Sequence, residues 1–500
     1  MVKGIRTRVG ARVVIRRIIQ DSHPQNEDME STRRTFIRRA ALGATGIALG
    51  SSWAVQGSAA GSRFISARSY GRIMGANDRV RVGVVGFSDR FRQSLYPCFV
   101  DHSREMNFEF AALSDLWRLR REEGVAFLRE KTGGEVAPCR NNEELYQRSD
   151  IDAVIISTAD FQHALHLAEA AREGKDAYCE KPFAETMDDA NAALEAVRKA
   201  GIVVQIGSQR RSAPNYQAAS DYIRSGKFGE IVMVEMSWNV NQPGRWRRPG
   251  LCAAIRENDT DWPRYLMNRP RVAWDPRKYL EYRLFWPYSS GIPGQWMCHQ
   301  IDTVHWFTGL AYPRSVVANG GIYQWKDGRT NADTLTAVFD YGPAGERSSG
   351  FQVVYTSRFS NSAGGTKELY YSNGGMLNLD TNMVTSDGGL REREAAAMDL
   401  KPNLLETFEL PRVTVETAAN TSGDPMTSAH MRNWMECVRS RAVTHAPVEA
   451  GYNHAVACIM ANAAFRTGRP VVFDPRSRQV LAGDRKRTRL NSSHVSQSRM

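Results

Sequence analysis

The chain has 500 residues, of which 42% are hydrophobic and 24% charged, enough for two domains with buried cores. Its formal net charge of +12 is concentrated at the ends, since residues 1–60 hold ten basic and four acidic side chains and residues 476–500 hold seven and one. The chain between them is balanced in charge, which excludes nucleic acid and membrane surfaces as partners of its body.

The first segment, residues 1–60, resembles an export leader. Paired arginines in TRRTFIR (32–38) precede a weakly apolar, Gly- and Ala-rich run over 40–55 and a small-residue cleavage pattern. These features are typical of a twin-arginine signal, and the run is too short and Gly-rich to span a bilayer comfortably. We expect the machinery for twin-arginine substrates to export the protein to the periplasm, with no stable membrane span after cleavage. Residues 1–28 would then lie upstream of the true start of translation.

Short apolar runs alternate with stretches of helical period between residues 79 and 210. This alternation predicts a parallel, doubly wound α/β sheet. The first run leads into a turn at Gly86 and the second ends on Asp115, which is the outline of a dinucleotide-binding fold. The predicted strands are 80–86, 107–115, 151–160, the run before Glu180 and 203–209, and the predicted helices are 163–174 and 186–201.

The tripeptide Glu180-Lys181-Pro182 ends one of these strands. Proline fixes φ and lacks a backbone donor, so the chain must leave the sheet there. A lysine is thereby presented at the carboxyl end of a strand, where open α/β sheets bind their ligands. Its ammonium suits proton transfer or a hydrogen bond to a substrate hydroxyl. On this motif alone, a solvated surface lysine remains an equal alternative.

The pattern changes past residue 230 to strands rich in aromatic and β-branched residues. Their alternation predicts an open, mostly antiparallel sheet. Two amphipathic helices follow over 426–441 and 451–468, and we expect the last helices to pack back on the first domain. The boundary between the domains is therefore not cleanly sequential.

A second candidate for chemistry lies in SGIPGQWMCHQIDTVHW (289–306). His299 and Asp302 would share one face of a helix at a spacing of three residues. A histidine suits acid–base chemistry, although a packed histidine without a catalytic task is the alternative. His305 repeats the spacing of three residues, so a helix could present two of these three side chains to a metal ion. No third convergent ligand is evident, and we predict no metal site.

The seven cysteines are scattered, and their number is odd. They form neither a disulfide framework nor a metal-type spacing, which fits folding in a reducing cytoplasm before export.

The last segment, residues 484–500, has no apolar periodicity. It resembles the translation of a sequencing adaptor, and we expect it to be a non-native tail.

Several motifs together resemble those of the Gfo/Idh/MocA oxidoreductases. They are GVVG (83–86), STADFQH (157–163), YCEKP (178–182) and GSQRR (207–211), and the likeness covers roughly residues 79–475. It implies an α/β dinucleotide-binding (Rossmann) domain over 79–210. An α+β domain over 211–475 would then supply the substrate wall and the interface of a homo-oligomer.

The resemblance also implies NAD as cofactor, with NADP possible. The chain departs from the usual glycine motif by placing Ser88 and Phe91 at the second and third positions. Ser88 could donate to a phosphate, whereas Phe91 implies a shifted helix or an altered phosphate grip.

Asp115 favours NAD, because a carboxylate pairs with a ribose 2′-hydroxyl, but Arg118 and Arg120 lie nearby and could reverse that preference. The expected cofactor contacts are Gly86, Ser88, Asp115, Thr158, His163, Glu180 and Lys181. A first-turn position for His163, behind a capping Asp160, is an equal alternative.

By resemblance, Lys181 and His299 are the catalytic pair. The expected substrate contacts are Arg210, Arg211, Gln295 and Asp302. Gln295 stands where family dehydrogenases often place an aspartate, so their mechanism does not simply carry over.

The resemblance implies hydride transfer between a nicotinamide and a sugar, polyol or related hydroxyl compound. The alternatives are an NAD-dependent glycoside hydrolase that acts by transient oxidation and elimination, and a non-catalytic periplasmic carbohydrate-binding protein on the same fold.

Overall fold

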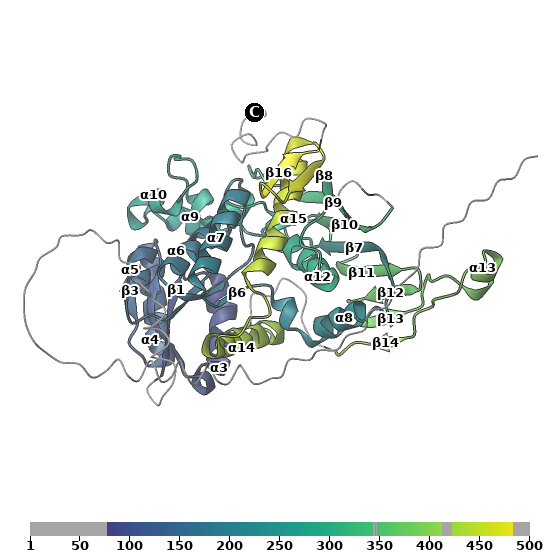
Figure 1. Ribbon diagram of the computed structural model, residues 1–500. Coiled ribbons are helices and arrows are strands. Elements are labelled where there is room, and N and C mark those ends of the chain that lie inside the picture. The colour runs from purple at the N-terminus through teal and green to yellow at the C-terminus, as the bar shows by residue number, and fades with distance from the viewer. Residues whose placement is uncertain (1–77, 344–345, 347, 413–422, 484–500) are drawn as a thin grey trace, which may run out of the picture. The chain divides into compact units, whose positions relative to one another are not determined.

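A six-stranded parallel sheet forms one side of the fold in the computed structural model, which describes residues 78–343, 346, 348–412 and 423–483 (Figure 1). Its order is β3-β2-β1-β4-β5-β6, so the direction of winding reverses between β1 and β4. The predicted doubly wound sheet is confirmed. The strands are β1 (Val80–Val85), β2 (Phe108–Ser114), β3 (Ala137–Cys139), β4 (Ala153–Ile156), β5 (Asp176–Cys179) and β6 (Val204–Ile206). The expected leader and tail lie outside the described residues.

Helices cover both faces of this sheet, which explains why its strands are apolar runs rather than alternating ones. The side chain of Thr186 caps α7 by accepting from Asp189 N, and Gly201 ends the helix at a φ of 64°. The strand of this sheet that the sequence did not predict is β3, a three-residue edge strand that contains a proline. The helices are α3 (Tyr96–Met106), α4 (Arg118–Thr132), α5 (Asn142–Tyr146), α6 (His163–Arg172) and α7 (Met187–Ala200).

The second sheet has ten strands in the order β14-β13-β12-β11-β7-β10-β9-β8-β15-β16. All neighbouring strands of this sheet are antiparallel except β7 and β10, so the predicted open, mostly antiparallel sheet is confirmed. Its strands are β7 (Ile231–Asn239), β8 (Ser315–Gly321), β9 (Thr334–Tyr341), β10 (Phe351–Arg358), β11 (Thr366–Ser372), β12 (Gly375–Asn378), β13 (Met383–Thr385), β14 (Phe408–Glu409), β15 (Val471–Asp474) and β16 (Gln479–Ala482).

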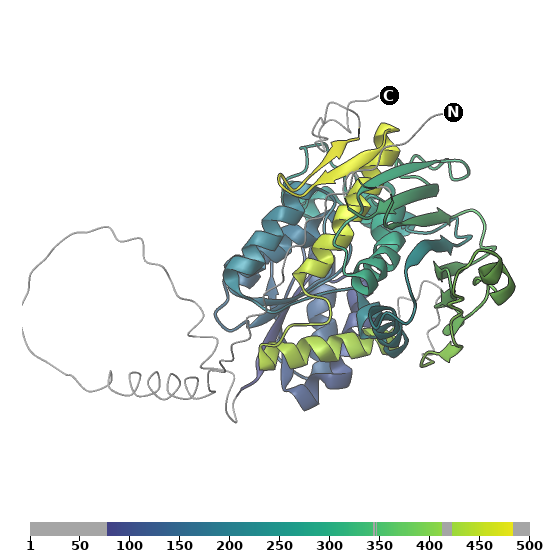
Figure 2. The same ribbon diagram turned by 45° about the vertical axis from the view of Figure 1, so that its right-hand side comes forward.

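Helices α12 (Cys298–Thr308) and α15 (Val448–Thr467) lie against the inner face of the second sheet, next to α8 (Pro214–Arg224). Both views show α15 running between the two sheets (Figures 1 and 2), and it contacts α7 and β6 on one side and β8 on the other. One continuous apolar core therefore joins the inner halves of both sheets.

A long connection, residues 240–292, links β7 to α12. It is fastened to the first sheet's helices by hydrogen bonds and ion pairs, among them Gln162 Nε2 to Tyr265 O at 2.7 Å and Arg269 to Asp189 at 2.9 Å. Its short helices are α9 (Pro249–Ala254), α10 (Trp262–Tyr265) and α11 (Pro276–Leu280), and α13 (Glu392–Ala397) lies further along the chain. Among the described helices, none is long and apolar enough to cross a bilayer.

Helix α14 (Pro425–Ser440) returns to the first sheet and packs on α3. Trp434 is fully buried there, with its ring 6.0 Å from the rings of both Phe108 and Tyr178. Gln205 Nε2 donates to His430 O at 3.0 Å, which ties α14 to β6. A segment more than 200 residues downstream thus completes the core of the dinucleotide-binding half.

We predict that Trp434→Ala lowers the free energy of unfolding by about 3–5 kcal/mol, because it removes a large side chain from a filled core. Urea denaturation followed by circular dichroism measures the loss. Val443→Ala is the control, since Val443 is 79% exposed and its truncation should change stability by less than about 0.5 kcal/mol. Equal stability of the two variants would contradict the packing of α14 described here.

Candidate functional site

A cavity of about 860 Å³ lies at the carboxyl ends of the parallel strands and is closed on its other side by the second sheet and by residues of 240–292. Most of the predicted site residues line it. The structure brings together Gly86, Ser88, Asp115, Thr158, His163, Glu180, Lys181, Arg210, Gln295 and His299. This is the position that open α/β sheets give to their ligands.

The turn after β1 shapes one end of the cavity. Gly86 has a φ of 88°, and a Cβ atom there would lie 2.9 Å from Thr158 Cγ2, so only glycine fits. Ser88 Oγ accepts from Phe91 N at 3.1 Å and caps the helical segment that follows. The first backbone N–H groups of that segment have no partner within the helix, which makes the turn suitable for a phosphate.

The unusual Phe91 does not enter the cavity. Its side chain is fully buried, with its ring 5.6 Å from Phe110 and 6.0 Å from Phe87. The chain accommodates it by forming a π-helical turn over Phe91–Leu95 before α3 begins. The helix start is therefore altered, as predicted, while the cavity side of the turn stays open.

Asp115 lies at the end of β2, on the cavity wall. Its two carboxylate oxygens accept from Phe87 N and Trp117 N, each at 2.9 Å, and burial raises its pKa above the usual value. Arg118 and Arg120 are already paired, with Asp259 and Glu123 respectively, each at 2.8 Å. The carboxylate is thus the fixed polar group at this corner.

Glu180 is joined to the turn after β1 by an arginine that sequence reasoning did not single out. Arg90 Nε lies 2.8 Å from Glu180 Oε1. Burial alone would raise the pKa of Glu180, but the Arg90 guanidinium lowers it below the usual value. Glu180 therefore stays ionised and holds the turn against the end of β5. The only available signal was an arginine within the atypical glycine motif.

Lys181 points across the cavity to the second half of the chain. Its Nζ donates to the backbone oxygen of Gln295 at 2.7 Å. Burial lowers the pKa of Lys181, and the nearby Cys298, Glu180 and Asp160 oppose that shift. An ammonium in this position has two further N–H groups to offer.

His299 faces Lys181 from the first turn of α12. Its ring centroid lies 6.0 Å from that of Trp238, and among the described residues none forms a hydrogen bond with the imidazole. Burial, followed by the charge of Lys181, holds the pKa of His299 well below 6.5. The imidazole is therefore neutral and able to accept a proton.

The carboxylate that Gln295 cannot supply comes from Asp160. This buried side chain accepts from Ser289 Oγ at 2.6 Å and from Gln295 Nε2, and Arg283 Nε lies 3.7 Å away. Asp160 does not cap the helix that follows, contrary to the alternative considered from the sequence. Sequence reasoning missed this role because Asp160 and Gln295 meet only in the folded chain.

His163 begins α6, but its ring is bound to the backbone. Nδ1 lies 2.8 Å from Pro182 O and Nε2 lies 3.2 Å from Thr158 O. Burial lowers its pKa. The ring therefore braces two strand ends, and only its edge lines the cavity.

The predicted substrate contacts separate into two sets. Arg210 lines the cavity, where it pairs with Glu368 and stacks on Trp238 at 5.6 Å. Arg211 and Asp302 do not reach the cavity wall, because the arginine binds the buried carboxylate through two contacts of 2.7 and 2.9 Å. This pair ties the turn Gln209–Ser212, which follows β6, to α12. No group of three metal-ligating side chains occurs within the part of the chain that the structure describes.

Residues 80–208 match the family model described as "Oxidoreductase family, NAD-binding Rossmann fold". The 1,5-anhydro-D-fructose reductase of Ensifer adhaerens is 33% identical over 156 residues, covering 29% of this chain and 46% of that protein. The inositol 2-dehydrogenase of Rubrobacter xylanophilus is 32% identical over 177 residues, covering 34% and 47%. The chain thus spans less than half the length of these curated relatives.

Solved structures match over a longer range. A probable dehydrogenase from Thermotoga maritima aligns with a TM-score of 0.53 and 17% identity over 79% of this chain and 99% of that one. A levoglucosan dehydrogenase in complex with NADH and levoglucosan aligns with a TM-score of 0.56 and 15% identity, with the same coverage. At these identities the likeness shows the fold.

A further buried carboxyl lies four residues after Lys181 in the chain. Glu185 is 3% exposed, and its Oε1 lies 3.0 Å from where a Cβ on Gly294 would stand. Burial, followed by the charge of Asp160, raises the pKa of Glu185 to about 8. Glu185 is therefore protonated at neutral pH and loses its proton only in mildly alkaline solution.

We predict that this carboxyl makes the protein less stable as the pH rises. The pKa of Glu185 is higher in the folded state, about 8, than in the unfolded state, near 4.5. Its contribution to stability is therefore fully present below pH 4.5 and is lost as the pH rises through about 8. Glu185→Gln cannot ionise, so between pH 5.5 and 8.5 the wild type should lose about 3 kcal/mol more than the variant. Urea titrations at both pH values measure this difference.

The control for this prediction is Glu173→Gln, which alters an exposed glutamate at the end of α6. It should retain the pH dependence of the wild type. Parallel stability curves for the wild type and Glu185→Gln would refute the assignment.

Proposed function

We propose that the chain, whose residues 80–208 match the NAD-binding model of the Gfo/Idh/MocA oxidoreductases, oxidises or reduces a CH–OH group of a sugar, polyol or related compound with NAD. The observation that carries the proposal is the pairing of Lys181 and His299 across one cavity. They come from different halves of the chain, and each has a pKa lowered by burial.

The cavity fits a nicotinamide dinucleotide, which supplies hydride transfer when bound. The turn Gly86–Arg90 would hold its pyrophosphate through backbone N–H groups, because Phe91 is packed away from the cavity side. Asp115 would accept from the hydroxyls of its ribose. These residues support the proposed cofactor site despite the atypical glycine motif.

Asp115 also supports NAD over NADP. Its carboxylate would repel a 2′-phosphate, and its two backbone donors keep it at the end of β2. The arginines that could reverse this preference, Arg118 and Arg120, are bound to other carboxylates.

Lys181 would bind the reacting oxygen of the substrate, and His299 would exchange its proton. The lysine ammonium, positioned by Gln295 O, donates a hydrogen bond to the reacting hydroxyl and stabilises negative charge that develops there. The neutral imidazole of His299 accepts the hydroxyl proton during oxidation and returns it during reduction. Asp160 offsets the charge of Lys181 from the other side of Gln295.

We predict that the purified protein releases NAD(H) on denaturation, and that Lys181→Met lowers turnover at least about 100-fold because it removes the donor to the reacting oxygen. Hydride transfer is followed at 340 nm with a panel of sugars and polyols, and bound nucleotide is measured in the supernatant of the denatured protein.

Lys199→Met is the matched control, since Lys199 is exposed on α7 and should leave turnover unchanged. Absence of nucleotide, together with absence of binding on titration, would favour a non-catalytic carbohydrate-binding protein. Release of nitrophenol from nitrophenyl glycosides without net NADH formation would favour the glycoside hydrolase. Full turnover by Lys181→Met would refute the assigned role.

We further propose that the protein acts in the periplasm after twin-arginine export, and that the open sheet forms a homo-oligomer. The paired Arg33 and Arg34, the Gly-rich run and the unpaired cysteines support the export route. The leader itself lies outside the described residues.

We predict that replacing both Arg33 and Arg34 with lysine leaves the precursor in the cytoplasm, because the export machinery reads the arginine pair. Cell fractionation and immunoblotting measure the distribution. Replacement of Arg38 and Arg39 with lysine is the control and should permit export. Periplasmic protein from the Arg33–Arg34 variant would overturn the proposed route.

A further inference from the structure

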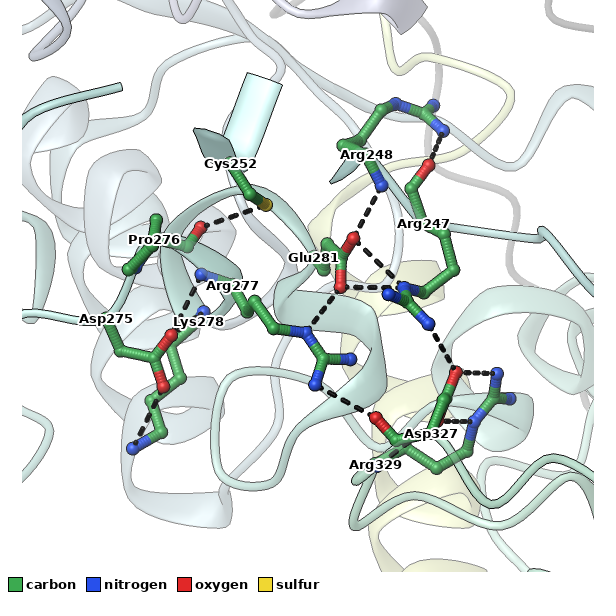
Figure 3. A network of polar contacts seen from close by, with 10 residues as sticks. All are labelled: Arg247, Arg248, Cys252, Asp275, Pro276, Arg277, Lys278, Glu281, Asp327 and Arg329. Carbon is green, nitrogen blue, oxygen red and sulfur yellow. Dashed lines mark hydrogen bonds and ion pairs between the residues drawn. The ribbon is translucent and has the colours of Figure 1, made fainter. Parts of the chain in front are cut away.

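The connection between β7 and α12 is rich in arginine, and most of these guanidinium groups are bound by carboxylates (Figure 3). Glu281, only 1% exposed, accepts from Arg247 Nε at 3.1 Å and from Arg277 Nε at 2.8 Å. Asp327 binds Arg329 through contacts of 2.8 and 2.9 Å. This network fixes the backbone of the connection, because Glu281 also accepts from Arg248 N at 2.6 Å.

Arg245, two residues before this network, has no carboxylate partner among the described residues. Its guanidinium lies over Trp296 at 5.5 Å and over Trp246 at 5.9 Å, and Nη1 donates to Gln242 Oε1 at 2.7 Å. The Nε atom is buried, and no described residue forms a hydrogen bond with it. Arg245 lines the cavity, so its charge faces the space that a ligand would enter.

The backbone at this point is held in a strained form. Trp246 has a φ of 65°, in the left-handed region that a bulky side chain rarely adopts. Its ring packs on Phe359 at 5.0 Å and on Trp296 at 5.8 Å, which holds the turn in place. Strain of this kind is concentrated at ligand sites. The turn thus orients Arg245 toward the cavity.

Two further guanidinium groups of the 240–292 connection line the same cavity. Arg283 Nε donates to Gln295 Oε1 at 2.8 Å, and Arg248 lies 3.5 Å from Asp89. Burial, followed by the charges of Arg283 and Arg248, lowers the pKa of Arg245 to about 10. A cation buried among like charges is costly, and stacking on tryptophan offsets only part of that cost.

We propose that the substrate is a sugar that carries an oxyanion, a carboxylate or a phosphate, and that Arg245 binds this group with Arg283 beside it. The inference rests on the proposed action on sugar or polyol hydroxyls, and it narrows the substrate to acidic sugars. The planar guanidinium is suited to both oxyanions, because it donates two parallel hydrogen bonds to either. The hydroxyl that reacts would then lie between Lys181 and His299, in the same cavity.

A second arginine provides a matched control. Arg466 also stacks on a tryptophan, Trp286, at 5.0 Å; its Nε is also buried without a partner, and burial lowers its pKa to about 10. It does not line the cavity. Stacking on a tryptophan without a carboxylate partner is therefore no sign of a ligand site by itself. Arg245 differs from Arg466 in that it lines the cavity.

The test is calorimetric titration of the full chain, without added cofactor, at constant ionic strength. The probes are D-glucuronate, D-galacturonate, D-gluconate and D-glucose 6-phosphate, with D-glucose as the neutral reference. We expect at least one anionic sugar to bind at least about 10-fold more tightly than D-glucose. Arg245→Gln should abolish that preference and leave the Kd of D-glucose within about twofold. Arg466→Gln should preserve the preference.

The outcomes separate the possible anions. Tighter binding of the sugar acids would identify the group that Arg245 binds as a carboxylate. Tighter binding of D-glucose 6-phosphate would identify it as a phosphate. The proposal is overturned if no anionic sugar is preferred, if Arg245→Gln weakens all sugars equally, or if that variant instead loses NADH affinity measured by fluorescence. If Arg245→Gln does not fold, Arg245→Lys should reduce the preference about three- to tenfold, since it keeps the charge but loses the paired donors. An equal preference in Arg245→Lys would also overturn it.

Because these titrations need no hydride transfer, they remain informative if the proposed oxidoreductase activity fails. A protein without bound NAD(H) that still selects anionic sugars through Arg245 would keep this inference and lose the proposed reaction.

Discussion

The buried ammonium of Lys181 is the constraint on which the rest of the site depends. A cation that leaves water needs hydrogen-bond acceptors and nearby negative charge. Gln295 supplies a backbone oxygen at 2.7 Å, Glu180 lies beside it in the chain, and Asp160 adds a carboxylate from the neighbouring loop. These groups belong to both halves of the protein. The lysine therefore has its full set of partners only when the two sheets are assembled.

The route of the chain secures that assembly. Residues 240–292 leave the second sheet, bind to helices of the first, and return to α12 with His299. Helix α14 then completes the core of the parallel sheet, and α15 lies between both sheets (Figure 2). Because each half supplies parts of the other, the cavity forms a permanent part of the fold and not a gap between independent domains.

Local patterns were sufficient to predict most of the framework. Apolar runs that end at Gly86 and Asp115, and a proline directly after Lys181, predicted the strands of the parallel sheet and the side on which ligands bind. The edge strand β3 was missed, because three residues with a proline carry no strand signal. Arg211 and Asp302 were assigned to the substrate, yet they bind each other, because the sequence does not reveal which buried charge meets which.

By itself, the sequence determined the fold class, the cavity's position and the central lysine, since these follow from periodicity and from backbone chemistry at a strand end. The charge balance around that lysine depends on the tertiary structure. Asp160 replaces the carboxylate that Gln295 lacks, and Phe91 turns into the core and leaves the turn open. Arg245 faces the cavity, and no carboxylate of the described residues pairs with it. The reason is physical: electrostatic and packing partners are set by distances in space between residues that lie far apart in the chain.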